Sequence, residues 1–84
     1  MRINVQEKLL DFICQVFCVE VEEIDLNKSL IDEGIIDSFG LIEISSFLEN
    51  TFSIEVAETE MIRENFGSVC KIVDYTWRKM HKDE

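Results

Sequence analysis

The chain of 84 residues has no proline, a single histidine and no long run of apolar residues. No segment approaches the ~20 consecutive apolar residues that a membrane-spanning helix requires, so we expect no transmembrane helix. Catalysis by a Ser-His or Cys-His pair needs a base beside the nucleophile, but His81 has no serine or cysteine near it in the sequence. The sequence therefore does not predict an enzyme that acts alone, and we predict no catalytic residues.

Basic residues are scarce as well, because 8 Lys and Arg face 18 Asp and Glu, which gives a formal net charge of −10. This charge repels nucleic-acid phosphates and anionic membrane surfaces, so we expect neither as a partner. A basic protein surface suits it better. A hydrophobic content of 46% is too high for a disordered acidic tail.

The N-terminal segment does not have the apolar core of a signal peptide, because Glu7, Lys8 and Asp11 interrupt it. We therefore expect the protein in the cytoplasm. We also expect residues 1–84 to form one small domain that acts as a monomer.

The three cysteines, an odd number, do not predict a disulfide framework. Cys14 and Cys18 are one helical turn apart, but a zinc site needs a second pair of ligands, which Cys70 alone does not supply. We predict that these cysteines are small buried hydrophobes, and we predict no metal site.

Three segments show apolar residues at the three- and four-residue spacing that is typical of amphipathic helices. The first, of about 14 residues, begins with Asn4 as its N-cap and Glu7 as the partner in a capping box. The second begins near Ser38. The last begins after Ser68, its predicted cap, and ends among basic residues that complement the helix dipole: Lys79, His81 and Lys82.

The segments between these helices are also informative. Residues 19–37 lack a helical period but carry aliphatic residues, so we expect a long structured loop, with a turn at Gly34. A short third helix capped by Thr59 is predicted to end before Gly67. Together these features predict an all-α four-helix bundle with three longer helices and one short third helix.

The second predicted helix has two apolar faces. One carries the residues expected in the core: Leu41, Ile44, Leu48 and Phe52. The opposite face is more apolar than solvation requires, and we predict that it is a partner-binding surface: Phe39, Ile42, Glu43, Ser46 and Glu49. The alternative is that its two apolar residues are isolated on the surface and have no function.

Ser38 at the start of this helix is the other candidate site residue. A phosphate ester there would face unpaired backbone N–H groups and the positive end of the helix dipole. Asp37 either caps the helix or holds a cation during the reaction of an incoming enzyme. Gly40 costs roughly 1 kcal/mol against alanine within a helix but leaves the backbone uncovered. On periodicity alone, the alternative is that Ser38 is an ordinary N-cap serine.

Residues 30–44, LIDEGIIDSFGLIEI, resemble the hydrophobic loop, the Gly-x-x-Asp-Ser-(hydrophobic) motif and the second helix of the acyl carrier protein family, which includes peptidyl and D-alanyl carrier proteins. Residues 52–56 and 64–69 match later segments of the family, so the similarity covers essentially the whole chain. The pair Phe39-Gly40 is closer to D-alanyl and some stand-alone carriers than to fatty-acid carriers, which usually have leucine and an acid there.

This resemblance implies a covalent cofactor and a set of partners. A phosphopantetheinyl transferase would move 4′-phosphopantetheine from coenzyme A onto Ser38, with Asp37 as the neighbouring acid. The thiol of the arm would carry an acyl or aminoacyl group as a thioester from a ligase to downstream enzymes. The alternative is an unmodified helical adaptor that keeps the carrier-like fold without a prosthetic group.

Five apolar residues could either pack in the core or line an apolar cleft for cargo, and core packing is favoured: Phe39, Leu41, Met61, Ile62 and Phe66.

Overall fold

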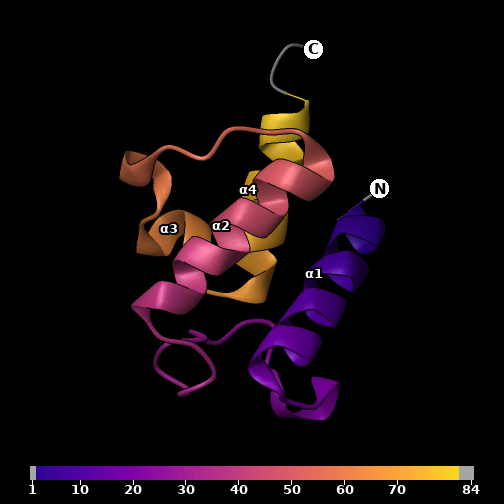
Figure 1. Ribbon diagram of the computed structural model, residues 1–84, viewed down its shortest axis with the longest axis vertical. Coiled ribbons are helices and arrows are strands. Elements are labelled where there is room, and N and C mark those ends of the chain that lie inside the picture. The colour runs from indigo at the N-terminus through magenta and orange to yellow at the C-terminus, as the bar shows by residue number, and fades with distance from the viewer. Residues whose placement is uncertain (1, 82–84) are drawn as a thin grey trace.

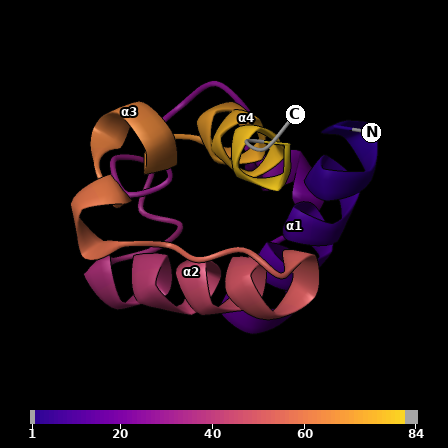
Figure 2. The same cartoon turned by 90° about the horizontal axis from the view of Figure 1, so that it is seen from above.

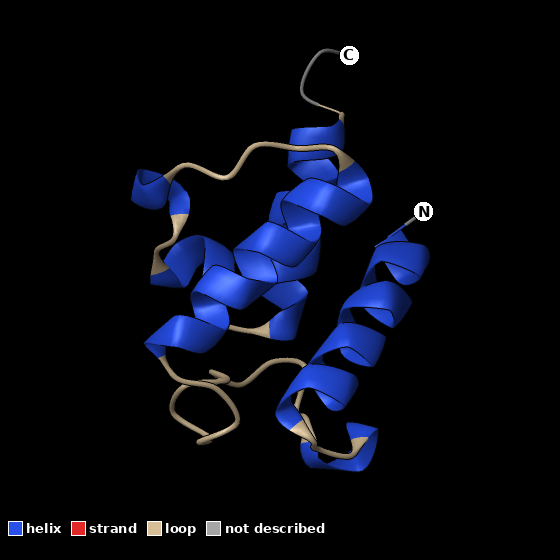
Figure 3. Cartoon of the chain, viewed as in Figure 1, coloured by secondary structure: helices blue, strands red, loops and turns tan. Residues whose placement is uncertain are grey.

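The computed structural model describes residues 2–81 as helices joined by loops (Figures 1 and 3). In chain order the elements are α1 (Arg2–Phe17), the 3-10 turn η1 (Val21–Glu23), α2 (Ser38–Phe52), the 3-10 turn η2 (Glu58–Glu60), α3 (Arg63–Phe66) and α4 (Val69–Met80). Within residues 2–81 there is no strand, and no helix is long and apolar enough to cross a membrane. The predicted all-α four-helix bundle with a short third helix is confirmed.

The core lies between the helices, with α4 next to both α1 and α3 (Figure 2). Each of the three longer helices contributes fully buried aliphatic side chains: Leu9, Ile13, Ile44, Leu48, Val69 and Ile72. The predicted apolar face of α4 is buried along most of its length, through Val69, Ile72, Val73, Tyr75 and Thr76. Of the predicted basic residues at its end, Lys79 and His81 lie there, whereas Lys82 lies outside the described residues.

The predicted start of the first helix is wrong. α1 already includes Arg2, so Asn4 and Glu7 both lie inside the helix and do not form a capping box. Nothing in Arg2 or Ile3 disfavours helical backbone, and the burial of Val5 secures the first turn against the core. A capping box is a set of local hydrogen bonds at a helix start. It does not form when the residues before it also adopt helical backbone angles.

The predicted cap of the third helix is also wrong. Thr59 lies within η2, and α3 begins after Ile62. The segment between α2 and α4 is divided because η2 is a separate turn, in which the Glu60 N–H donates to the Ala57 carbonyl at 2.9 Å. The predicted end of α3 before Gly67 is confirmed.

The long loop between α1 and α2 is packed down, as predicted, by Ile24, Leu30 and Ile36, which are buried. At Gly34 the backbone turns with φ of 76°, a conformation that favours glycine. The N–H groups of Ile35 and Ile36 both donate to the Leu30 carbonyl, at 2.9 and 3.3 Å. These bonds fix the position of the residues that lead into α2.

A row of phenylalanines joins α1 to α2. Phe12 stacks on Phe47 with ring centroids 4.3 Å apart, and each ring also meets a neighbour edge-on, Phe17 at 6.4 Å and Phe52 at 6.1 Å. Phe17, at the end of this row, lies against the backbone of Gly40. Through these ring contacts, the packing of α1 fixes the position of the first turn of α2.

Substitution of Gly40 by alanine is expected to destabilise the fold, although alanine is the better helix former. A Cβ at this position would lie 2.7 Å from the Ile36 Cβ and 3.2 Å from the Phe17 ring. Overpacking costs about 1–3 kcal/mol, which outweighs a propensity gain of about 1 kcal/mol. Urea unfolding should show a lower free energy of unfolding for Gly40→Ala, with Ser46→Ala, an exposed site on the same helix, near neutral. A stabilised Gly40→Ala protein would contradict the close contact.

Candidate functional site

Ser38 is the first residue of α2, and its side chain is exposed. The N-cap is the preceding residue: Asp37 has extended backbone angles, and its Oδ1 accepts a hydrogen bond from the Gly40 N–H at 3.0 Å. The alternative that Ser38 is an N-cap serine is therefore wrong, and of the two roles considered for Asp37 the structure shows the cap. Because the cap does not depend on the Ser38 hydroxyl, that hydroxyl can be esterified without dismantling the helix start.

The surroundings of Ser38 fit a phosphate ester. The first backbone N–H groups of α2 and the positive end of its dipole lie at this end of the helix, where a negative charge is stabilised. The exposure of Ser38 gives an incoming enzyme access to its hydroxyl. The negative charge of Asp37 opposes the ester, but its carboxylate is already engaged with the Gly40 N–H.

Two hollows flank the first turn of α2. The α1-side hollow has a volume of about 550 Å³ and is lined by Phe17, Gly34, Ile35, Ile36, Asp37, Phe39 and Glu43. The α3-side hollow has a volume of about 100 Å³ and is lined by Ser29, Ile31, Leu41, Met61, Ile62, Arg63, Phe66 and Gly67. Phe39 and Leu41 face different hollows because two residues span about 200° around a helix.

The α3-side hollow tests the prediction of an apolar cleft. Four of the five residues named for the cleft line this hollow: Leu41, Met61, Ile62 and Phe66. Phe66 is buried and also belongs to the core, so core packing and the hollow share this residue. The prediction is wrong for Phe39, which lines the α1-side hollow instead.

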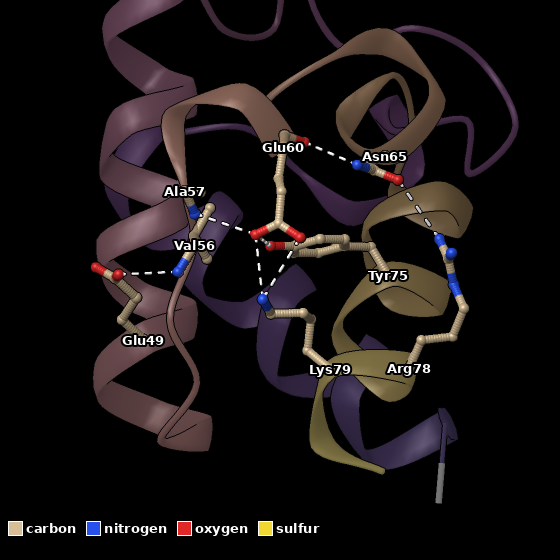
Figure 4. A network of polar contacts seen from close by, with 8 residues as sticks. All are labelled: Glu49, Val56, Ala57, Glu60, Asn65, Tyr75, Arg78 and Lys79. Carbon is tan, nitrogen blue, oxygen red and sulfur yellow. Dashed lines mark hydrogen bonds and ion pairs between the residues drawn. The ribbon is translucent and has the colours of Figure 1, made fainter. Parts of the chain in front are cut away.

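Glu60 directly precedes Met61 and Ile62 of the α3-side hollow and lies at the centre of a network of polar contacts (Figure 4). Its Oε1 accepts hydrogen bonds from the Ala57 N–H, the Tyr75 hydroxyl and the Lys79 ammonium group, each at 3.1 Å. Its backbone carbonyl accepts from the Asn65 side-chain amide at 2.9 Å. Because Tyr75 and Lys79 belong to α4, Glu60 ties the segment that follows it to the core.

These contacts shift two pKa values. The Ala57 N–H, followed by Lys79, lowers the pKa of Glu60 below its usual value. Burial, followed by the hydrogen bond to Glu60, raises the pKa of Tyr75. At neutral pH Glu60 is therefore ionised and Tyr75 neutral, which is the state in which the Tyr75 hydroxyl donates a hydrogen bond to the carboxylate.

We expect ionised Glu60 to make the fold sensitive to acid. A carboxyl with a lowered pKa stabilises the folded state above its unfolded pKa, about 4.3 for glutamate, and this contribution is lost as the pH falls through the folded pKa. Glu60→Gln should therefore lose less stability than the wild type on acidification, while being less stable at neutral pH. Thermal unfolding over a pH series measures both, with the exposed Glu58→Gln in the same turn as the control. Parallel curves for wild type and Glu60→Gln would contradict this role.

The predicted partner-binding surface is largely one exposed face of α2. Phe39 and Ile42 expose 74% and 54% of their surface, and Glu43 and Ser46 are exposed beside them. Glu49 differs, because it is half-buried and its Oε2 accepts a hydrogen bond from the Val56 N–H at 3.0 Å (Figure 4). The structure thus shows Glu49 holding the loop after α2, and its contact with a partner stays a prediction.

The cysteines do not form a site. Cys14 is half-buried, but Cys18 and Cys70 are exposed, so the prediction that these cysteines are buried is wrong for two of them. Cys18 directly follows α1, with a left-handed φ of 56°, and therefore does not continue the apolar stripe of the helix. Burial, followed by the charge of Glu20, raises the pKa of Cys14, which disfavours the reactive thiolate. Among residues 2–81 no group of three metal-binding side chains is present.

Comparison with known proteins gives a consistent result. The family model described as "Phosphopantetheine attachment site" matches residues 7–75. A D-alanyl carrier protein of Streptococcus uberis is 38% identical over 71 residues, which cover 84% of this chain and 89% of that protein. A D-alanyl carrier protein of Streptococcus suis is 33% identical over 78 residues, covering 93% and 98%. One of Streptococcus pyogenes serotype M1 is 33% identical over 70 residues, covering 83% and 87%.

Proposed function

The chain belongs to the family with a phosphopantetheine attachment site, and from this premise we propose that Ser38 is the residue modified and Asp37 the acid beside it. As a carrier protein, the chain bears covalent 4′-phosphopantetheine, which supplies a terminal thiol for thioester formation. The observation that supports Ser38 is its place as an exposed hydroxyl on the first residue of α2, next to a cap formed by another residue. An ester at this position leaves the helix start intact.

Other serines suit the modification less well. Ser45 and Ser68 are buried, and the Ser68 hydroxyl already caps α4 by accepting from the Lys71 N–H. Ser29 is half-buried in the loop before α2, where its hydroxyl accepts from the Asp32 N–H. Ser46 and Ser53 are exposed but lie in later turns of α2 or at its C-terminal end. The helix dipole stabilises an anion only near the first turn, so these positions lack the field that Ser38 has.

The cargo that we propose is an amino acid, with D-alanine as the first candidate. Several relatives that match most of this chain are named as carriers of D-alanyl groups. The Phe39-Gly40 pair after the serine, which resembles such carriers, points the same way. The thioester would form between the carboxyl group of the amino acid and the thiol of the prosthetic group.

Partners and location follow from the carrier role. We propose that residues 1–84 act as a single monomeric carrier domain in the cytoplasm, without catalytic groups of their own and without nucleic acid or membrane as partners. A phosphopantetheinyl transferase, an aminoacyl ligase and downstream enzymes would supply the chemistry. The family match favours this role over an unmodified helical adaptor.

The proposal is tested by incubating the wild-type protein with coenzyme A and a promiscuous phosphopantetheinyl transferase. Intact mass spectrometry should show the addition of one phosphopantetheinyl group, and fragmentation of the peptides should place it on Ser38. No added mass would overturn the carrier assignment for this chain. Addition at another serine would overturn the assignment of Ser38 alone.

Reversal of the charge at Glu43 is expected to slow association with enzymes that present a basic surface. Glu43 lies exposed beside Phe39 and Ile42, and charges at such a rim act mainly on the association rate. Glu43→Lys should reduce that rate roughly 3- to 10-fold at low ionic strength, with a smaller effect at high salt. Stopped-flow association with the transferase measures this, with Glu55→Lys, exposed beyond the C-terminal end of α2, as the control for net charge. Equal rates for the two variants would count against the surface.

A further inference from the structure

We propose that the α1-side hollow is a binding site for the cationic end of an aminoacyl thioester tethered to Ser38. This inference rests on the proposed function, and it adds the place where the cargo is held and the chemical class of cargo that the place selects. The residues that carry it are Phe17, Ile36, Asp37, Phe39 and Glu43.

The hollow lies within reach of the tether. Asp37 and Phe39 line it and are the covalent neighbours of Ser38. A prosthetic group attached to Ser38 therefore begins at the rim of the hollow. We expect the flexible arm to fold back on itself and bring its acylated end to the site.

The charge of the hollow matches an ammonium group. All its lining residues are apolar, glycine or acidic, with the carboxylates of Asp37 and Glu43 as the charged groups. One oxygen of Asp37 accepts from the Gly40 N–H, which leaves the other oxygen for a ligand. An aminoacyl thioester keeps its α-ammonium group, because only the carboxyl group is used in the linkage.

The apolar walls of the hollow can contact the side chain of a small amino acid. Phe17 is a fixed wall, since its ring lies against the Gly40 backbone and meets Phe12 edge-on. Phe39 is 74% exposed, so its ring is available to a ligand. Aromatic faces attract cations within about 6 Å, and Ile36 offers an apolar contact for a methyl group.

The α3-side hollow does not suit the same cargo. It is lined by Arg63, whose guanidinium group lies 3.6 Å from the Asp32 carboxylate. An ammonium group entering there would find no carboxylate among the lining residues, whereas the α1-side hollow offers Asp37 and Glu43. The two hollows therefore differ in the charge of the cargo that they accept.

The test compares D-alanyl with isobutyryl cargo, in which a methyl group replaces the ammonium group. Both are attached to ¹⁵N-labelled protein from preloaded coenzyme A analogues, so no ligase is needed, and intact mass confirms attachment. Relative to the unloaded holo protein, D-alanyl cargo should shift the amide resonances of Phe17, Ile36 and Glu43. Isobutyryl cargo should shift these resonances less.

A matched pair of variants isolates the charge. Glu43→Gln should reduce the D-alanyl-induced shifts at Phe17 and Ile36 at least about twofold, because one attracting carboxylate is removed, while Glu55→Gln leaves them unchanged. Equal shifts for the two cargoes, or D-alanyl shifts confined to the residues of the α3-side hollow, would overturn the inference. Failure of attachment would instead count against the proposed function, and the mass spectrum separates the two cases.

Discussion

Ser38→Ala is expected to abolish attachment of 4′-phosphopantetheine completely, while Ser46→Ala retains it. A phosphate ester requires a hydroxyl oxygen, which alanine lacks, so the effect is all-or-none rather than a change of rate. The α2 cap comes from the Asp37 carboxylate, and Ser38 is exposed. We therefore expect the free energy of unfolding of Ser38→Ala to stay within about 0.5 kcal/mol of the wild type.

The measurement is intact mass after incubation with coenzyme A and a phosphopantetheinyl transferase. Ser46→Ala is a suitable control because Ser46 is exposed on the same helix, yet it lacks the helix N-terminal position. Circular dichroism and urea unfolding of both variants show whether the fold is kept. If folded Ser38→Ala gained the same mass as the wild type, another residue would be the attachment site. If Ser46→Ala lost modification as well, Ser38 alone would not explain the result.

Leu48→Ala is expected to have the largest effect on stability. The Leu48 side chain is fully buried, with 0% of its surface exposed, and truncation of such a residue typically costs about 2–5 kcal/mol. An 84-residue domain has a total stability of roughly 4–13 kcal/mol at typical values per residue. The substitution therefore removes a large share of the free energy of unfolding, and a substantial unfolded population becomes measurable.

Urea unfolding of Leu48→Ala and Leu48→Met provides the test. Methionine conserves most of the volume, so its cost should stay below about 1.5 kcal/mol. At a temperature where Leu48→Ala is partly unfolded, the initial rate at which the transferase modifies it should fall in proportion to the folded fraction. Leu48→Met should be modified at the wild-type rate. A loss below about 1 kcal/mol for Leu48→Ala would contradict the tight packing around this side chain.

Local sequence patterns predicted those parts of the fold that depend on local interactions. The start of α2 and the Ser68 cap of α4 could be predicted because a cap and an apolar stripe act within a few residues. Asn4 shows the limit of this reasoning, since an available cap does not start a helix when the preceding residues also fit one. Phe39 and Leu41 point to different sides of α2, and this separation follows from helical geometry alone.

The remaining features depend on contacts between distant segments. Glu60 reaches Tyr75 and Lys79, which lie 15 and 19 residues further along the chain. The contact of Phe17 with Gly40 likewise joins two helices. No periodicity encodes these pairings, so neither the division of η2 from α3 nor the α1-side hollow beside Ser38 could be predicted from the sequence. The family resemblance predicted Ser38 as the attachment site but not the hollows beside it.

The cap at Asp37 has a consequence for how other proteins distinguish the forms of this carrier. Since the hydrogen bond from Gly40 ends on Asp37 and not on Ser38, the modified and unmodified chains are expected to share the same first turn of α2. An enzyme that contacts only the backbone of this turn would then recognise both forms equally. Discrimination between an empty and a charged carrier is expected to come from contact with the attached arm and with cargo held beside Phe39 and Glu43.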